Sequence, residues 1–156
     1  MKIKWKELLI AIAIPLSLGA LTGFLTRGSM ENFERITKPP LSPPGWLFPV
    51  VWTILYTLMG IASYLVYTSI APKGQIKTAL KFYLLQLFFN ILWSFLFFTF
   101  ELYYFSFAWL LILLALIIIT AVLFYNISKP AAYMLIPYII WVAFAGHLNL
   151  GIAILN

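Results

Sequence analysis

The sequence predicts an all-α integral membrane protein, a bundle of five transmembrane helices that forms a single domain over residues 1–156. The chain is 64% hydrophobic and only 9% charged, whereas an ordinary soluble domain is about half apolar and about a quarter charged. Its ten basic and four acidic residues fall in clusters separated by long charge-free runs. Each run can cross a bilayer core, which needs about 20 helical residues. A chain of this length could not hide so much apolar surface from water, so its expected solvent is the lipid bilayer.

Five predicted spans account for almost the whole chain. They cover residues 8–26, 46–67, 82–100, 104–125 and 133–155. The first follows a basic start, as in a signal peptide, but its apolar stretch exceeds the usual ~15 residues and no clear cleavage site is present, so we expect it to be retained. Residues 73–81 are expected to form a short basic hairpin. The turn at Glu101 is so short that the third and fourth spans should be antiparallel neighbours.

One long connection, residues 27–45, separates the first two spans. It carries charges of both signs and then the stretch KPPLSPPG, residues 38–45, in which four prolines fall close together. Such a density of prolines is incompatible with regular helix. We therefore expect a stiff, extended lid over one mouth of the bundle.

Basic residues are distributed unevenly between the two ends of the predicted bundle. The N-terminal side carries Lys2, Lys4, Lys6, Lys73, Lys77, Lys81 and Lys129, and the other side carries Arg27, Arg35 and Lys38. The positive-inside rule then places the N-terminus in the cytoplasm and the C-terminus outside. Because the basic residues alternate between the two sides and form no single stripe, we expect no nucleic-acid binding.

Few side chains in the predicted spans can carry ionic chemistry. No Asp, Glu, Lys or Arg lies well inside a span, which counts against a proton-coupled carrier, because such carriers use intramembrane ionisable groups. His147 lies inside the fifth span and could be an axial ligand to haem iron. A polar role between helices or at the membrane interface is the more common one and is favoured. The chain has no cysteine, and no metal site is expected.

Tryptophan is unusually frequent, with six in 156 residues. Indoles favour the two membrane interfaces, and three occupy positions that fit this role: Trp5, Trp46 and Trp109. The others, Trp52, Trp93 and Trp141, lie deeper in their spans. A deep indole must either pack against another helix with its N–H satisfied or line a cavity. Packing would explain any one of them, whereas three with polar neighbours favour a cavity.

Helical spacing places polar and aromatic neighbours on the same faces as the deep tryptophans. The resulting stripes are Trp52 with Tyr56, then Gln86, Asn90 and Ser94 beside Trp93, and finally Tyr138, Trp141 and Ala145. One interpretation of the polar stripe is hydrogen bonding between helices, at about 0.6 kcal/mol per contact. The other is an aromatic slot with a few convergent polar groups, suited to a large, flat, apolar ligand.

A long motif over residues 38–67, KPPLSPPGWLFPVVWTILYTLMGIASYLVY, closely resembles the signature of the translocator protein family, the tryptophan-rich sensory proteins of the TspO/MBR type. The resemblance continues through FFNILWS, residues 88–94, and LIPYIIWVAFA, residues 135–145, followed by Leu148 and Asn149. It covers nearly the whole chain, although the first and fourth spans match by little more than hydrophobicity.

The resemblance implies a pocket under the loop between the first two spans, which accepts porphyrins, synthetic aromatic ligands and, in animal members, cholesterol. With the stripes above, the expected ligand-binding set is Phe33, Pro43, Phe48, Trp52, Tyr56, Asn90, Trp93, Ser94, Tyr138, Trp141 and Ala145. Tetrapyrrole propionates are expected near Arg35 and Lys38. Some members are reported to degrade protoporphyrin in light and oxygen, which would assign redox-active indoles to Trp52 and Trp141. Whether this chain is an enzyme stays open.

Several departures from the family pattern limit what the resemblance implies. The fourth span lacks an aspartate near Leu110, and residues 149–156 lack the Tyr, Lys or Arg of the animal cholesterol motif. The third span has no Gly or Ala after Phe82, so the close-packed dimer seam of bacterial relatives is not available. A homodimer would need another face.

The leading hypothesis is a membrane receptor or carrier for tetrapyrroles such as protoporphyrin IX and haem, with no required cofactor. We expect it in the plasma membrane of a bacterium or archaeon. A small multidrug or metabolite transporter is one alternative. A structural membrane protein, in which the deep tryptophans serve only packing, is the other.

Overall fold

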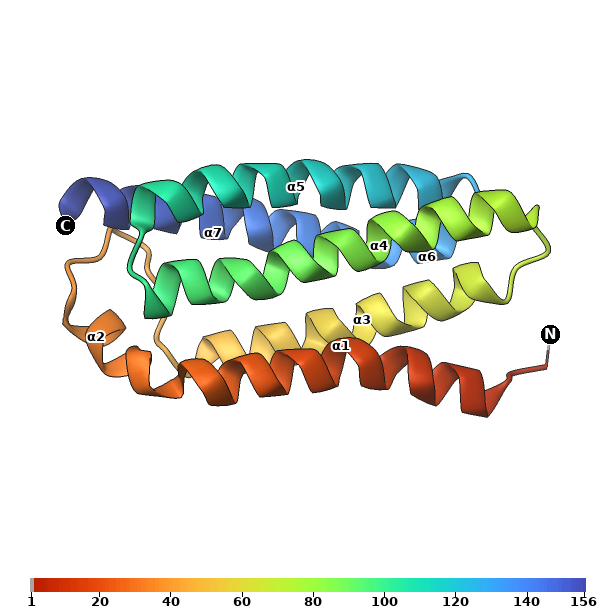
Figure 1. Ribbon diagram of the computed structural model, residues 1–156, viewed down its shortest axis with the longest axis horizontal. Helices are drawn as coiled ribbons and strands as arrows, with labels where there is room; N and C mark the ends of the chain where they lie inside the picture. The colour runs from red at the N-terminus through yellow and green to blue at the C-terminus, as the bar shows by residue number, and fades with distance from the viewer. Residues whose placement is uncertain (1) are drawn as a thin grey trace.

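The protein, described over residues 2–156 by a computed structural model, is a bundle of long antiparallel helices (Figure 1). Its elements are α1 (Trp5–Thr26), η1 (Arg27–Ser29), α2 (Met30–Arg35), α3 (Leu47–Tyr67), α4 (Lys73–Ser94), η2 (Phe95–Thr99), α5 (Tyr103–Tyr125), α6 (Lys129–Met134) and α7 (Ile136–Leu155). Five helical segments are long and apolar enough to cross a membrane, and none of the described residues lies in a strand. The predicted fold class is confirmed.

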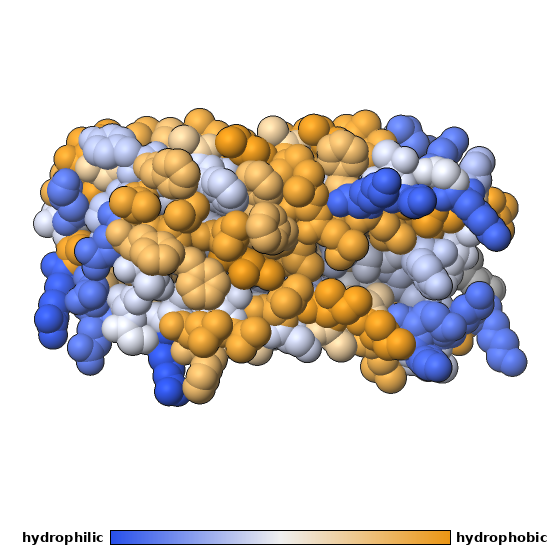
Figure 2. All heavy atoms as spheres, viewed as in Figure 1, coloured by the Kyte–Doolittle hydropathy of each residue, from blue (hydrophilic) through white to orange (hydrophobic). Residues whose placement is uncertain are grey.

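The helices are arranged so that the two termini lie at opposite ends of the bundle (Figure 1). Helix α1 packs mainly on α3, whereas α5 packs on both α4 and α7. The predicted neighbourhood of the third and fourth spans is therefore confirmed. An apolar belt covers the middle of the molecule, and hydrophilic side chains gather at both ends (Figure 2). This distribution suits a protein surrounded by lipid tails and flanked by headgroups.

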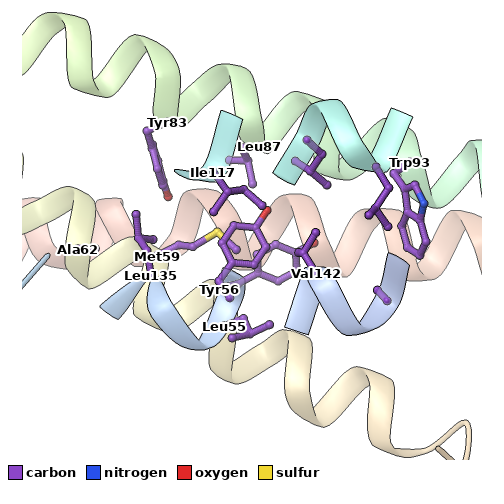
Figure 3. Packing of buried hydrophobic residues seen from close by; sticks show 14 of the residues in the cluster. Leu55, Tyr56, Met59, Ala62, Tyr83, Leu87, Trp93, Ile117, Leu135 and Val142 are labelled. Atoms are coloured by element: carbon purple, nitrogen blue, oxygen red, sulfur yellow. The ribbon is translucent and has the colours of Figure 1, made fainter. Parts of the chain in front are cut away.

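Close contact between α1 and α3 depends on a glycine. A Cβ atom added to Gly60 would lie 2.5 Å from Ile12 Cα and 2.8 Å from the Ala11 carbonyl oxygen. Small residues of this kind let two membrane helices approach backbone to backbone. Further inside, Met59, Leu87 and Ile117, from α3, α4 and α5, are almost fully buried in one apolar cluster (Figure 3).

The predicted basic hairpin over residues 73–81 is wrong, because these residues form the first turns of α4. Pro72 precedes the helix and has the φ of −55° that proline imposes. Lys73, Lys77 and Lys81 recur every four residues and are all exposed. Long lysine side chains can extend from a helix end toward the headgroups, so a cluster of charge need not mark a loop.

The fifth span starts earlier than predicted and is interrupted. It begins at Lys129, with Pro130 in the first turn of α6, and a break at Leu135 separates α6 from α7. Pro137 has no N–H to donate to the carbonyl four residues earlier, which accounts for the break. The interruption lies at the end of the bundle away from α2 (Figure 1).

The connection between the first two spans is only partly the extended lid predicted. Residues 27–35 are helical, as η1 and α2, and the non-helical stretch begins at Ile36. Glu31 and Arg35 form an ion pair of 3.8 Å along α2. Charge alone therefore does not prevent a short helix here, and only the proline-rich part is irregular.

The irregular part of the lid is fastened to the far end of the sequence. The Thr37 N–H donates to Asn156 Oδ1 at 3.1 Å, and Asn156 Nδ2 donates to the Thr37 carbonyl oxygen at 2.8 Å. A Cβ atom added to Gly151 would lie 2.7 Å from Pro39 Cγ, so this proline packs directly on the α7 backbone. We call this contact between residues 37–39 and α7 the lid clasp.

Candidate ligand-binding site

A cavity of about 510 Å³ lies between α1, α3, α4 and α7, in the half of the bundle nearer the lid. It is lined by Leu16, Gly19, Ala20, Thr22, Gly23, Thr26, Arg27, Met30, Phe48, Pro49, Trp52, Thr53, Tyr56, Trp93, Ser94, Phe98, Trp141 and Ala145. Its volume falls in the range of small-molecule sites, about 300–1,000 Å³. Ala20, Gly23 and Thr53 are exposed on the outer surface, so the cavity reaches the surface near α1 and α3.

All three deep tryptophans line this cavity, as the interpretation that favoured a cavity over simple packing expects. Trp52 of α3 stacks on Tyr56 with ring centroids 5.3 Å apart. Trp93 of α4 stacks on Phe97 at 5.1 Å, and Trp141 of α7 meets Phe48 edge to face at 5.8 Å. Three separate helices thus each bring one supported indole to a single space.

A chain of buried hydrogen bonds lies behind the Tyr56 wall. Tyr56 OH donates to Asn90 Oδ1 at 3.0 Å, and Asn90 Nδ2 donates to Tyr138 OH at 2.6 Å. Tyr138 OH donates in turn to Gln86 Oε1 at 2.7 Å. The interpretation of the polar stripe as hydrogen bonding between helices therefore holds for Gln86 and Asn90, which join α4 to α3 and α7. Ser94, the third member of the stripe, lines the cavity instead.

Asn90 and Tyr138 were expected in the ligand-binding set, but neither lines the cavity. Both are almost fully buried. Their position is behind Tyr56, whose ring they hold through the chain of hydrogen bonds just described. Phe48, Trp52, Tyr56, Trp93, Ser94, Trp141 and Ala145 are the members of the set that the structure brings together around the cavity.

A second network fixes the indole of Trp93. Its Nε1–H donates to Asn149 Oδ1 at 3.0 Å, and Ser106 Oγ donates to the same oxygen at 3.1 Å. Asn149 Nδ2 donates to the Tyr103 carbonyl oxygen at 2.8 Å, which joins α7 to α5. Ser106 was not among the predicted site residues, because a single serine in a largely apolar span was the only signal for it.

The polar groups of the cavity wall are mostly occupied within the protein. Thr22, Thr26 and Thr53 each donate a hydroxyl to a carbonyl four residues earlier, at 2.7–2.8 Å. Trp141 Nε1 is buried and has no hydrogen-bond partner among the described residues. Because few donors or acceptors are left for a ligand, the interior suits a largely apolar molecule.

Phe33 and Pro43 belong to the lid and line a second hollow of about 20 Å³. This hollow shares Phe48, Trp93, Phe98 and Ala145 with the main cavity. The Phe33 ring meets Phe48 and Phe98 edge to face, at 5.9 and 5.4 Å. These two predicted site residues therefore lie where the lid packs against the cavity wall, and they do not line the cavity itself.

The two cations expected near ligand propionates do not line the cavity. Arg35 pairs with Glu31, and Lys38 Nζ donates to the Glu34 carbonyl oxygen at 3.1 Å. Arg27 lines it instead. Arg27 was expected only as a charge in the loop, because nothing in the sequence indicates which loop cation faces the helices.

The single histidine and the other three tryptophans lie away from the cavity. His147 is exposed and does not line the cavity, so it is not placed to ligate an iron there. Trp5 and Trp46 are exposed, as expected of interfacial indoles. Trp109 was expected in the same role, but it stacks on Phe89 at 4.2 Å and donates its N–H to the Phe89 carbonyl oxygen at 2.9 Å. It therefore fastens α5 to α4.

Comparison with known proteins agrees with the helical architecture. The sequence profile of the TspO/MBR family matches residues 11–155. The tryptophan-rich protein TspO of Chlorobaculum tepidum is 34% identical over 96% of this chain and 95% of its own length. The protein of the same name from Archaeoglobus fulgidus is 35% identical, over 96% and 97% respectively. The translocator protein of Bos taurus is 36% identical, over 85% of this chain and 82% of its own length.

Sequence and structure thus agree on the class of protein. The five membrane-spanning segments make it an integral membrane protein, surrounded by a lipid bilayer. The family match spans all five of these segments, together with the lid between the first two. The chain belongs to the TspO/MBR family.

Proposed function

We propose that the protein is a membrane receptor or carrier that binds tetrapyrroles, protoporphyrin IX and haem among them, in the cavity between α1, α3, α4 and α7. The observation that carries the proposal is the convergence of Trp52, Trp93 and Trp141 on one cavity of about 510 Å³. Aromatic walls favour a flat, conjugated ligand, because rings gain from stacked and edge-to-face contact beyond the burial of area.

The names of similar proteins support the broader part of this proposal. One relative, from Cereibacter sphaeroides, is called a tryptophan-rich sensory protein, and the bovine relative is called a translocator protein. These names support a sensory or transport receptor in a membrane. Relatives in bacteria and archaea support a plasma-membrane location in such an organism.

The chemistry of the cavity supports a ligand that is bound without a resident cofactor. Its walls offer aromatic faces and aliphatic side chains, and most of its hydroxyls are already bonded within the protein. In this proposal haem or protoporphyrin is the ligand, held through its ring plane. Stacking of this kind needs neither a metal ligand nor a proton relay.

A change in cavity volume tests the proposal without removing any tryptophan. Ala145→Leu would place three further carbon atoms in the cavity wall, whereas Ala143→Leu makes the same change at an exposed position of the same helix. We expect saturable quenching of tryptophan fluorescence by protoporphyrin IX, added in the dark to the purified protein in detergent. Ala145→Leu should weaken binding at least ~10-fold, or about 1.4 kcal/mol, and Ala143→Leu should leave it unchanged.

Two results would contradict the proposal. One is the absence of saturable quenching in the unsubstituted protein, and the other is equal affinity in both leucine variants. Illumination of the same samples in air tests the further suggestion of light-dependent degradation. A product spectrum that disappears when Trp52→Phe and Trp141→Phe are combined would favour chemistry over carriage.

A further inference from the structure

We propose that Arg27 is the anion anchor of the cavity, so that the site selects flat apolar ligands that carry carboxylates along one edge. The inference rests on the proposed function and deepens it, because it names the residue that would distinguish an acidic tetrapyrrole from its neutral ester. It also differs from the sequence-based expectation, which placed the propionates near Arg35 and Lys38.

The cavity wall offers almost no charge and few free polar groups. Arg27 is the only charged residue among the eighteen that line it. Thr22, Thr26 and Thr53 donate their hydroxyls to backbone carbonyls, and Tyr56 OH donates to Asn90. Among the described residues, Trp141 Nε1–H is a buried donor of this wall without a partner, but a single neutral donor does not compensate for the hydration that an ionised carboxylate would lose deep in this space. The acidic edge of a ligand is therefore expected at the rim.

The Arg27 side chain lies at the rim of the cavity and is free to turn. Arg27 directly follows α1, on the lid side of the cavity, and is exposed. Its guanidinium carbon lies 4.0 Å from the centroid of the Phe24 ring. Among the residues that the structure describes, no carboxylate lies within ion-pair distance of it, the one ion pair being that of Arg35 with Glu31. A cation–π contact at an exposed site is weak, so the guanidinium can turn to a ligand.

The neighbouring cations of the lid already have partners within the protein. Arg35 pairs with Glu31 on α2, and Lys38 Nζ bonds to the Glu34 carbonyl oxygen and lies 4.9 Å from the Phe33 ring centroid. Phe33 itself lines the small hollow beside the main cavity. A ligand in the main cavity would thus meet Arg27 before either of the other two.

A specific ligand orientation follows. The guanidinium presents a planar fork of N–H donors that matches a carboxylate in two parallel hydrogen bonds. Arg27 lies directly after α1 at the lid end of the bundle, and hydrophilic side chains gather at both ends of the molecule, where headgroups are expected (Figure 2). The ring plane would then insert between Trp52 and Trp141, with its acidic edge outward at the level of the headgroups.

The test compares protoporphyrin IX with its dimethyl ester, which has the same ring and no charge. Affinities are measured by fluorescence quenching in the dark, on the full chain in a neutral detergent at low salt. We expect the unsubstituted protein to prefer the acid. Arg27→Gln should weaken acid binding about 10-fold and leave ester binding unchanged, and Arg27→Lys should restore part of the preference. Arg35→Gln, the matched control, should behave as the unsubstituted protein.

The outcomes distinguish a failure of the Arg27 anchor from a failure of the proposed function. If both porphyrins bind and Arg27→Gln leaves the acid-to-ester ratio unchanged, the anchor is overturned while the proposed function stands. If Arg35→Gln removes the preference, the anchor belongs to the lid, and Arg27 is again overturned. If neither porphyrin binds the unsubstituted protein, the proposed function itself fails and the inference with it.

Discussion

Single side chains hold this bundle together through buried hydrogen bonds, and Tyr138 is central among them. Its hydroxyl accepts from Asn90 Nδ2 and donates to Gln86 Oε1, at 2.6 and 2.7 Å, with the residue fully buried. In lipid there is no water to replace either partner. The tyrosine therefore ties α7 to α4 and also fixes the group that supports Tyr56.

Tyr138→Phe should lower the free energy of unfolding by about 1–2 kcal/mol, because hydrogen bonds between membrane helices contribute about 0.6 kcal/mol each and two buried groups would lose a partner. Thermal unfolding in detergent, or unfolding by a denaturing detergent, measures this change. Tyr133→Phe removes the same atom from an exposed tyrosine of the same span. An equal loss in the two variants would contradict a role for the network.

Residues of the site were predictable where spacing alone decides which way they face. Trp52 and Tyr56 are four residues apart on one helix, and they stack at the cavity. Asn90 shares its stripe with Ser94, yet Asn90 is bonded behind the wall and Ser94 lines it. Spacing places both on one face but does not indicate how deep the neighbouring helix reaches. The position of Arg27 was unpredictable for a related reason, since it depends on where the lid turns.

At the scale of elements, the packing of one helix on another depends on small residues at the points where the helices cross. Gly60 permits α1 to lie directly on α3, although only Pro15, Thr22 and Thr26 of α1 are buried. Helix α1 otherwise faces outward, and α3 is the element on which it packs most extensively. Since α1 forms one wall of the cavity, the integrity of the site depends on this crossing.

Gly60→Ala should push α1 away from α3 and lower stability by about 1–3 kcal/mol, the usual effect of overpacking. The added Cβ would meet backbone atoms of Ala11 and Ile12, which cannot move aside as a flexible side chain could. Gly74→Ala, where a Cβ meets nothing within 4 Å, should instead be neutral or slightly stabilising through helix propensity. Thermal unfolding of both variants and their porphyrin affinity provide the measurement.

If Gly60→Ala unfolds at the same temperature as the unsubstituted protein, the close crossing of α1 and α3 does not contribute to stability as proposed. Retained porphyrin affinity in a destabilised variant would show that the cavity tolerates a shift of α1.

The elements themselves were predictable to the extent that hydrophobicity marks them. The spans ending near residues 26 and 67 end where the long apolar runs do, and α5 matches its predicted range within a residue. The start of α4 was missed because its first turns carry three lysines, a composition typical of a loop at a membrane surface. The break at Leu135 was missed because a proline in an apolar run does not by itself indicate where the helix will be interrupted.

The molecule as a whole has two hydrophilic ends of different charge. Seven lysines lie at the end that holds the N-terminus and the α3–α4 turn, and three cations lie at the lid end (Figure 1). From this imbalance, the positive-inside rule predicts an orientation in which the cavity and lid face the outside of the cell.

Single cysteines test this orientation cleanly, because the natural chain has none. Gly28→Cys at the lid end and Gly74→Cys at the other end are matched, since an added Cβ meets nothing within 4 Å at either position. With a membrane-impermeant maleimide, Gly28→Cys should be labelled in intact bacterial cells. Gly74→Cys should be labelled only after the membrane is broken. The reverse pattern would mean that the lid faces the cytoplasm.

The lid clasp has a consequence for the order of assembly. It joins Thr37, which precedes the second span, to Asn156, which follows the fifth, 119 residues later in the chain. A ribosome synthesises the first of these long before the second, so the lid stays unfastened while the intervening helices enter the membrane. The contact between the lid and α7 therefore forms only after all five spans have been synthesised, and a chain that ends before Asn156 would lack it.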